Sequence, residues 1–132
     1  MAKREYIEAN KRWLEEKKKE EGVKGLEKGV MYKVIKQGEG SGASPSPRSI
    51  VTVHYTGRTI NGRKFDSSLG GAPLACRLCG LIEGWIIALQ QMHVGDKWEL
   101  YLPADVAYGK FSQPGIPGGS TLVFEVELLG VG

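Results

Sequence analysis

Apolar side chains recur at spacings of three and four between residues 81 and 92. On an α-helix this spacing gathers them on one face, which predicts a short buried helix. The face consists of Ile82, Trp85, Ile86, Leu89 and Met92. Gly84 stands beside Trp85 and leaves two interpretations open. Without a neighbouring side chain the indole could lie uncovered as the floor of a pocket, or Trp85 could simply fill the core.

Strict alternation of apolar and polar residues predicts strands in other parts of the chain. Residues 50–58, 97–102 and 121–129 alternate in this way, and residues 30–36 are rich in β-branched and aromatic side chains. The alternation turns a set of apolar side chains toward the core: Val51, Val53, Tyr55, Trp98, Leu100, Leu102, Leu122, Phe124, Val126 and Leu128. Tyr101 falls on the opposite face, so residues 97–102 are expected to form a half-buried strand.

The dipeptide Asn61-Gly62 predicts a tight hairpin that turns residues 59–60 back into residues 63–66. Residues 69–80 carry no clear pattern and are expected to be irregular. Residues 103–120 contain three prolines and four glycines. A loop of this length in a small domain is usually functional.

Residues 3–21 are strong helix formers without Gly or Pro, and Gly22 follows them, which predicts an N-terminal helix. Tyr6 with Trp13 and Ile7 with Leu14 repeat at seven, fewer repeats than a coiled coil requires. The helix could pack on its own domain, pair with a second copy of the chain, or be the end of a longer helix.

These elements predict an α+β fold, in which a twisted antiparallel sheet of about five strands wraps a short core helix. The chain has 132 residues, the size of one domain with a single core. Residues 1–29 are expected to form the N-terminal helix and a linker, and residues 30–132 the domain that contains the sheet.

Charge and composition narrow the possible partners. The 18 Lys and Arg against 15 Asp and Glu give a net charge of +3, too mild to favour nucleic acid as a partner. No apolar run is long enough for a membrane helix, and residues 1–10 contain no signal-peptide core. We therefore expect a cytoplasmic protein, or a periplasmic one if a leader was removed. Cys76 and Cys79 are too few for a disulfide framework.

The sequence lacks the motifs of hydrolytic, nucleotide and metal chemistry, so neither a metal nor a cofactor is expected. His54 and His93 are more typical of surface or capping residues than of a catalytic base. What remains is a set of aromatic and aliphatic residues on separate elements: Tyr55, Phe65, Leu81, Ile82, Trp85, Tyr108 and Phe124.

Five segments of the chain carry a resemblance to a known family. They are Val53-His54-Tyr55-Thr56-Gly57, Phe65-Asp66-Ser67-Ser68, Ile82-Glu83-Gly84-Trp85, Ala107-Tyr108-Gly109, and residues 121–129. Their order and spacing are similar to those of the FKBP-type peptidyl-prolyl cis-trans isomerases, over about residues 30–131. The N-terminal helix and the residues that follow it resemble the linker helix of the FkpA and macrophage infectivity potentiator branch. One such motif would be weak, but five in register are specific.

The resemblance implies an isomerase that rotates X-Pro amide bonds without a cofactor and assists protein folding. Its partners would be proline-containing peptides and unfolded proteins, and macrolides such as rapamycin would inhibit it. Trp85 would be the floor beneath the proline ring, inside walls formed by Tyr55, Phe65, Leu81, Ile82 and Phe124. The Ile82 amide and the Tyr108 hydroxyl would hold carbonyl groups of the substrate.

The resemblance further implies that Asp66 accepts a hydrogen bond at the rim and fixes the Tyr55 hydroxyl, and that the loop around Gln113 and Ile116 is a mobile lip. For two of these residues a plainer interpretation stays open. Asp66 could be an ordinary turn carboxylate, and Phe124 could be a core residue only.

One residue departs from the family pattern. An aromatic side chain is expected within residues 73–78, and Cys76 stands at the position that aligns with it. The pocket would lose part of one wall unless Leu74 or Leu78 replaces it, so the chain could instead be a proline-peptide-binding or chaperone module with weak turnover. Cys76 and Cys79 also form a C-x-x-C pair, which leaves a thiol-disulfide role as a third hypothesis. The sequence lacks the βαβ setting of a redox motif and the second pair of ligands of a zinc site.

Overall fold

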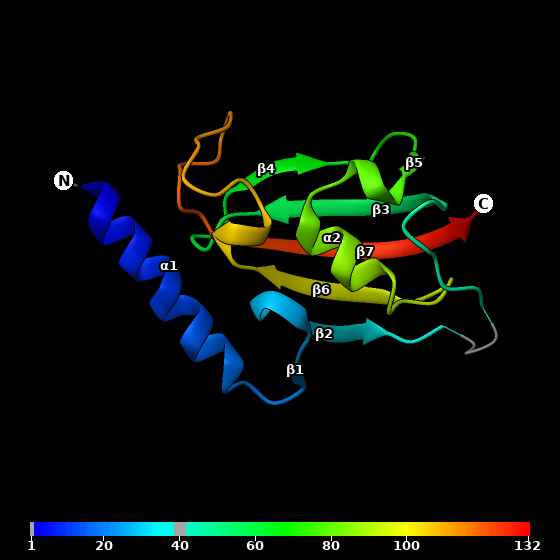
Figure 1. Ribbon diagram of the computed structural model, residues 1–132, viewed down its shortest axis with the longest axis horizontal. Helices are drawn as coiled ribbons and strands as arrows, with labels where there is room; N and C mark the ends of the chain where they lie inside the picture. The colour runs from blue at the N-terminus through cyan, green and yellow to red at the C-terminus, as the bar shows by residue number, and fades with distance from the viewer. Residues whose placement is uncertain (1, 39–41) are drawn as a thin grey trace.

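One antiparallel sheet with a short helix on it dominates the computed structural model, which describes residues 2–38 and 42–132 (Figure 1). The strands follow the order β1-β2-β6-β7-β3-β4, and β5 pairs with β3. Their bounds are Val23–Gly25 (β1), Met31–Lys36 (β2), Ile50–Arg58 (β3), Lys64–Ser67 (β4), Leu74–Arg77 (β5), Lys97–Leu102 (β6) and Leu122–Val131 (β7). The helices are Ala2–Lys18 (α1) and Glu83–Leu89 (α2), with 3-10 turns at Glu27–Gly29 (η1), Leu78–Gly80 (η2) and Ala104–Val106 (η3).

The predicted α+β fold is confirmed, but within residues 2–38 and 42–132 the sheet has seven strands and not about five. The additional strands β1 and β5 contain three and four residues. So short a strand shows too little alternation to be recognised. β5 lies in the segment expected to be irregular, where Val53 pairs with Leu74 and Ile50 with Arg77.

Both helices end about three residues before their predicted ends. After α2, the amides of Gln91 and Met92 bond to the carbonyls of Ala88 and Leu89, three residues back. After α1, the amides of Lys19 and Glu20 bond to carbonyls three residues back in the same way. This tighter turn is a common way to end a helix, and the hydrophobic pattern does not reveal it.

The hydrophobic core lies between α2 and the sheet. Trp85, Ala88, Leu89 and Met92 pack against the side chains that the alternation of β3, β6 and β7 turned inward. The inward sets predicted for β6 and β7 are all buried, as are Val51 and Val53 on β3.

The opposite face of β6 is also covered, which corrects the expectation of a half-buried strand. Tyr101 is only 1% exposed. The Trp13 ring of α1 lies 5.8 Å from the Tyr101 ring, and Lys17 Nζ lies 5.1 Å above it. Burial, followed by the hydrogen bond that the hydroxyl donates to Glu99, raises the pKa of Tyr101. The helix therefore packs on its own domain, and pairing with a second copy stays a prediction.

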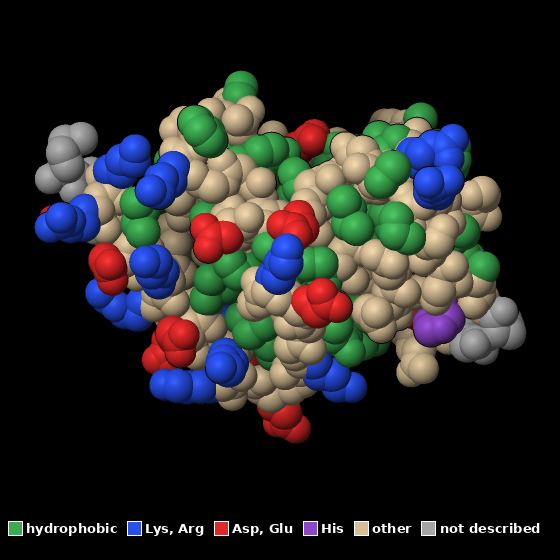
Figure 2. Space-filling view, in the orientation of Figure 1, with side chains coloured by type: hydrophobic (Ala, Val, Ile, Leu, Met, Phe, Trp, Pro, Cys, Tyr) green, Lys and Arg blue, Asp and Glu red, His purple; other side chains and the backbone are tan. Residues whose placement is uncertain are grey.

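Charged side chains of both signs are mixed over the α1 end of the molecule (Figure 2). The described helices, of which α1 is the longest at 17 residues, do not combine the length and apolar character needed to cross a membrane.

Gly84 allows α2 to approach β6 closely. A Cβ atom at this position would lie 2.7 Å from both Cδ1 and Cδ2 of Leu102. Leu102 is fully buried, and close-packed protein cores contain few voids into which such a side chain can move. Gly84 is therefore not what leaves the indole of Trp85 open. A side chain at position 84 would point at Leu102.

We expect Gly84→Ala to lower the free energy of unfolding. Overpacking a core costs about 1–3 kcal/mol, and the better helix propensity of alanine offsets at most about 1 kcal/mol of this. Urea unfolding of Gly84→Ala and of Gly80→Ala measures the difference. Gly80 has open space around its Cα and serves as the matched control. Equal midpoints for the two variants would contradict the packing argument.

Candidate functional site

A cavity of about 170 Å³ opens beside Trp85. Residues from β3, β4, β5, β7, the start of α2 and the loop 103–120 line it: Tyr55, Phe65, Asp66, Leu74, Leu81, Ile82, Trp85, Tyr108 and Phe124. Eight of these nine were expected at the site from the sequence. The structure thus brings residues from distant parts of the chain around one hollow.

Gly57 makes room for two of the aromatic rings. It pairs with Phe124 on β7 and with Asp66 on β4, so it lies between the two neighbouring strands that carry the rings. A Cβ atom on Gly57 would lie 2.6 Å from Phe124 Cε1 and 2.6 Å from Phe65 Cζ. Any side chain here would displace both phenyl rings. Sequence reasoning placed Gly57 in a motif but assigned it no role.

The rings meet edge to face. The centroids of Trp85 and Phe124 lie 5.2 Å apart at 88°, those of Phe65 and Phe124 5.6 Å apart at 88°, and those of Tyr55 and Trp85 5.4 Å apart at 79°. This is the arrangement that aromatic quadrupoles favour. Trp85 and Phe124 are each only 4% exposed, yet both line the cavity. They therefore belong to the core and to the cavity at once, and the two interpretations of each residue do not exclude one another.

The polar groups of the cavity are few. The Tyr55 hydroxyl donates a hydrogen bond of 2.7 Å to Asp66 Oδ2, and the Ser67 amide donates one of 2.9 Å to Asp66 Oδ1. Asp66 therefore combines the local turn contact with the contact to Tyr55. The buried Nε1 of Trp85 finds no acceptor among the described residues, so the floor carries one unsatisfied donor.

The hydroxyl of Tyr55 stays protonated well above neutral pH. Burial raises its pKa to about 12, with smaller contributions from the hydrogen bond to Asp66 and from the charge of that carboxylate. Loss of the proton would place a second negative charge beside Asp66 at a partly buried position. Tyr55 is thus a fixed donor over the physiological range.

Three residues expected at the site do not line the cavity. Cys76 is half-buried on β5, two residues beyond Leu74, and it is Leu74 that forms this wall. Gln113 is exposed, whereas Ile116 is 5% exposed and belongs to the core. The backbones of Gln113 and Ile116 exchange two hydrogen bonds of 2.8 Å across a tight turn. Leu78, the other candidate replacement for the wall, is fully buried away from the cavity.

Comparison with known proteins decides the family. The model of the FKBP-type peptidyl-prolyl cis-trans isomerase matches residues 42–129, and the model of the domain amino-terminal to it matches residues 1–34. The chain belongs to the FKBP-type peptidyl-prolyl cis-trans isomerase family. The resemblance inferred from the five segments is confirmed.

Individual relatives agree with the branch that the sequence indicated. The chain is 51% identical over 120 residues to the FKBP-type 22 kDa peptidyl-prolyl cis-trans isomerase of Escherichia coli, covering 89% of this chain and 57% of the relative. It is 42% identical over 126 residues to the peptidyl-prolyl cis-trans isomerase Mip of Coxiella burnetii, covering 94% and 54%. The crystal structure of FkpA from Escherichia coli superposes with a TM-score of 0.91 at 41% identity, covering 98% of this chain and 61% of that one. The chain thus spans about half the length of these curated relatives.

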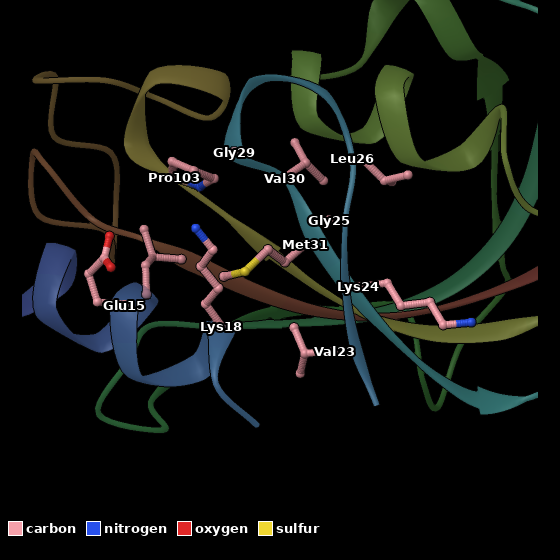
Figure 3. Close-up of a pocket in the computed structure, with 11 residues that line it drawn as sticks. Glu15, Lys18, Val23, Lys24, Gly25, Leu26, Gly29, Val30, Met31 and Pro103 are labelled. Carbon is pink, nitrogen blue, oxygen red and sulfur yellow. The ribbon is translucent and has the colours of Figure 1, made fainter. Parts of the chain in front are cut away.

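A larger cavity of about 550 Å³ lies between α1, the β1–η1 segment and Pro103 of this FKBP-type fold (Figure 3). Its described lining residues include Glu15, Lys18 and Lys24, and none of them is aromatic. Because size alone says nothing of chemistry, we take the smaller aromatic cavity as the candidate site.

The thiols of this FKBP-type chain lie outside the aromatic cavity. Cys76 and Cys79 are both free, and Cys79 is exposed. Within residues 2–38 and 42–132 no group of three His, Cys, Asp or Glu side chains is placed to hold a metal ion.

The ionisation of Tyr55 gives a direct test of its burial and of its hydrogen bond to Asp66. The raised pKa means that folding favours the neutral phenol of Tyr55. Its contribution to the free energy of unfolding is fully present below the ordinary tyrosine pKa of about 10 and is lost as pH rises through about 12. Phenolate difference absorbance between wild type and Tyr55→Phe measures this ionisation. In Asp66→Asn we expect a lower pKa that still exceeds the ordinary value, because burial is the larger cause. A Tyr55 that ionises at its ordinary pKa would contradict the description of the site.

Proposed function

We propose that this chain is a peptidyl-prolyl cis-trans isomerase that rotates X-Pro amide bonds in the aromatic cavity. The observation that carries the proposal is the convergence of Tyr55, Phe65, Trp85 and Phe124 on one hollow of about 170 Å³. Its substrates would be proline-containing peptides and unfolded proteins, and macrolides such as rapamycin would compete for the same hollow.

The chemistry of the reaction suits such a cavity. Rotation of an amide crosses a barrier of about 18–20 kcal/mol because the twisted state loses resonance, and uncatalysed X-Pro exchange takes tens of seconds or more. The twisted amide has a less polar carbonyl than the planar one, so water stabilises the planar ground state more strongly. A dry aromatic site removes this preference and binds the twisted state better in relative terms. An acceleration of about 10⁵ requires about 7 kcal/mol in this way.

Each residue of the cavity has a role in this proposal. The proline ring lies on Trp85, and the edges of Tyr55, Phe65 and Phe124, which carry partial positive charge, surround the carbonyl group that turns. The Ile82 amide, at the N-cap of α2, and the Tyr108 hydroxyl hold the flanking carbonyls. Asp66 fixes the Tyr55 ring through the hydrogen bond to its hydroxyl. The proposal requires no acid, base or cofactor.

The alternative of a binding module with weak turnover depended on a wall lost at Cys76. The presence of Leu74 in the lining favours an enzyme over that module. A thiol-disulfide role gains no support from the positions of Cys76 and Cys79 outside the cavity. The compartment in which the protein works stays a prediction.

We expect Phe65→Ala to lower kcat/KM by about tenfold or more, because the cavity loses one wall and admits water. Protease-coupled isomerisation of a Xaa-Pro peptide, with and without rapamycin, measures it. Phe111→Ala is the matched control, since Phe111 is 78% exposed and does not line the cavity. Rapamycin binding by a wild-type protein that shows no turnover would support the binding module and contradict the enzyme.

Leu74 and Cys76 can be separated by the same assay. Truncating a residue of an apolar pocket costs on the order of tenfold in kcat/KM, and we expect this for Leu74→Ala. Cys76→Ala is expected to change the value by less than about twofold. A larger loss of kcat/KM for Cys76→Ala would contradict this prediction and would indicate that Cys76 contributes to substrate binding. A loss of function in Cys76→Ser alone, with reactive thiols, would support the thiol hypothesis.

A further inference from the structure

The N-terminal helix contacts the loop that carries Tyr108. Helix α1 and the loop 103–120 lie at the same end of the sheet (Figure 1). Asn10 of α1 is 1% exposed, and its Oδ1 accepts a hydrogen bond of 2.7 Å from the Thr121 amide. Its Nδ2 donates a bond of 2.8 Å to the Tyr6 carbonyl, one turn earlier in the helix. This buried amide side chain thus has partners for both of its polar atoms and joins the helix to the end of the loop.

Two more residues of the same helix face hold the same segment. The Tyr6 and Ser120 hydroxyls lie 2.6 Å apart in a hydrogen bond. A Cβ atom on Gly119 would lie 2.5 Å from Ile7 Cγ1, so Ile7 packs directly on the backbone there. Tyr6, Ile7 and Asn10 therefore fix three consecutive residues, 119–121, at the end of the loop.

From this segment the contact continues to the cavity. The Gly119 amide donates a hydrogen bond of 2.8 Å to the Gly109 carbonyl, and the Gly109 amide donates one of 2.8 Å to the Ala104 carbonyl. Gly109 directly follows Tyr108, which lines the cavity. The route from Asn10 to the cavity therefore consists of two hydrogen bonds, to Thr121 and from Gly119 to Gly109, joined by the backbone of residues 119–121 and completed by the peptide link to Tyr108.

We propose that α1 is a positioning element of the site and that Asn10 is a positioning residue acting through Gly119, Gly109 and Tyr108. A loop of this length has many conformations of similar energy unless other elements restrain it. Restraint by α1 keeps the Tyr108 hydroxyl where a substrate carbonyl arrives, and misplacement of a contacting group costs rate. The inference rests on the proposed function, because the role of Tyr108 is measured by isomerisation.

The alternative is that Asn10 contributes to stability alone, and a double-mutant cycle distinguishes the two. In the wild-type background we expect Asn10→Ala to lower kcat/KM by roughly tenfold. In the Tyr108→Phe background, where the positioned hydroxyl is absent, we expect a loss of less than about twofold. Equal losses in both backgrounds would overturn the proposal.

Trp13→Leu is the control for stability, because Trp13 packs the same helix on Tyr101 of β6, whereas the contacts to residues 119–121 come from Tyr6, Ile7 and Asn10. We expect it to lower the unfolding midpoint with less than about twofold change in kcat/KM. Tyr6→Phe removes a single hydroxyl and replaces Asn10→Ala in the test if Asn10→Ala does not fold. We expect it to lower kcat/KM in the wild-type background and not in the Tyr108→Phe background. Losses of kcat/KM that follow the unfolding midpoint across the three variants would also overturn the proposal.

Amide hydrogen exchange gives a measurement that needs no substrate. We expect the Gly109 and Gly119 amides to exchange faster in Asn10→Ala than in wild type, and to be unchanged in Trp13→Leu. This result would support the coupling between α1 and the loop even if the wild-type protein showed no isomerase activity. Absence of that activity would contradict the proposed function alone. Unchanged exchange at both glycines in Asn10→Ala would refute the coupling whatever the activity.

Discussion

The candidate site depends on the contact that two phenyl rings make with the bare backbone of Gly57. Phe65 and Phe124 reach this point from β4 and β7, the two strands on either side of β3. β5 pairs with the earlier part of β3, where Val53 opposes Leu74. The register of one central strand therefore sets three sides of the cavity. Because a slip by one residue turns every side chain to the other face of a sheet, the cavity exists only in this register.

The sequence predicted those parts of the fold in which a pattern is long enough to be read. β3, β6 and β7 have nine, six and ten residues, and their alternation identified the inward side chains correctly. β1 and β5 are too short for this. The burial of Tyr101 could not be predicted from β6 either, since it results from the docking of Trp13 from a distant helix. Alternation reports which residues share a face, and only packing decides whether that face is covered.

The site shows the same division between local pattern and packing. The aromatic residues were found because their motifs stand in a specific order, and seven of the nine lining residues lie in these motifs, with Leu81 directly before one of them. The choice between Leu74 and Cys76 was not accessible, because the two residues lie two apart on one strand and share a face. What separates them is the position of β5 along β3. Gly84 was misread for a related reason, since the residue that requires its small size, Leu102, is remote in sequence.

One physical property connects the ionisation of Tyr55 with the proposed catalysis. Poor hydration disfavours the charged phenolate, and this is the main cause of its raised pKa. In the proposed reaction the same burial would disfavour the polar planar amide relative to the twisted one. The two effects place different requirements on the site. The phenol of Tyr55 needs one hydrogen-bond acceptor, which Asp66 supplies. A rotating carbonyl must have no strong hydrogen-bond donor at any angle. A cavity with aromatic walls and Asp66 as its carboxylate meets both requirements of the proposed reaction, so polar groups added to the walls would slow rotation even where they strengthened binding.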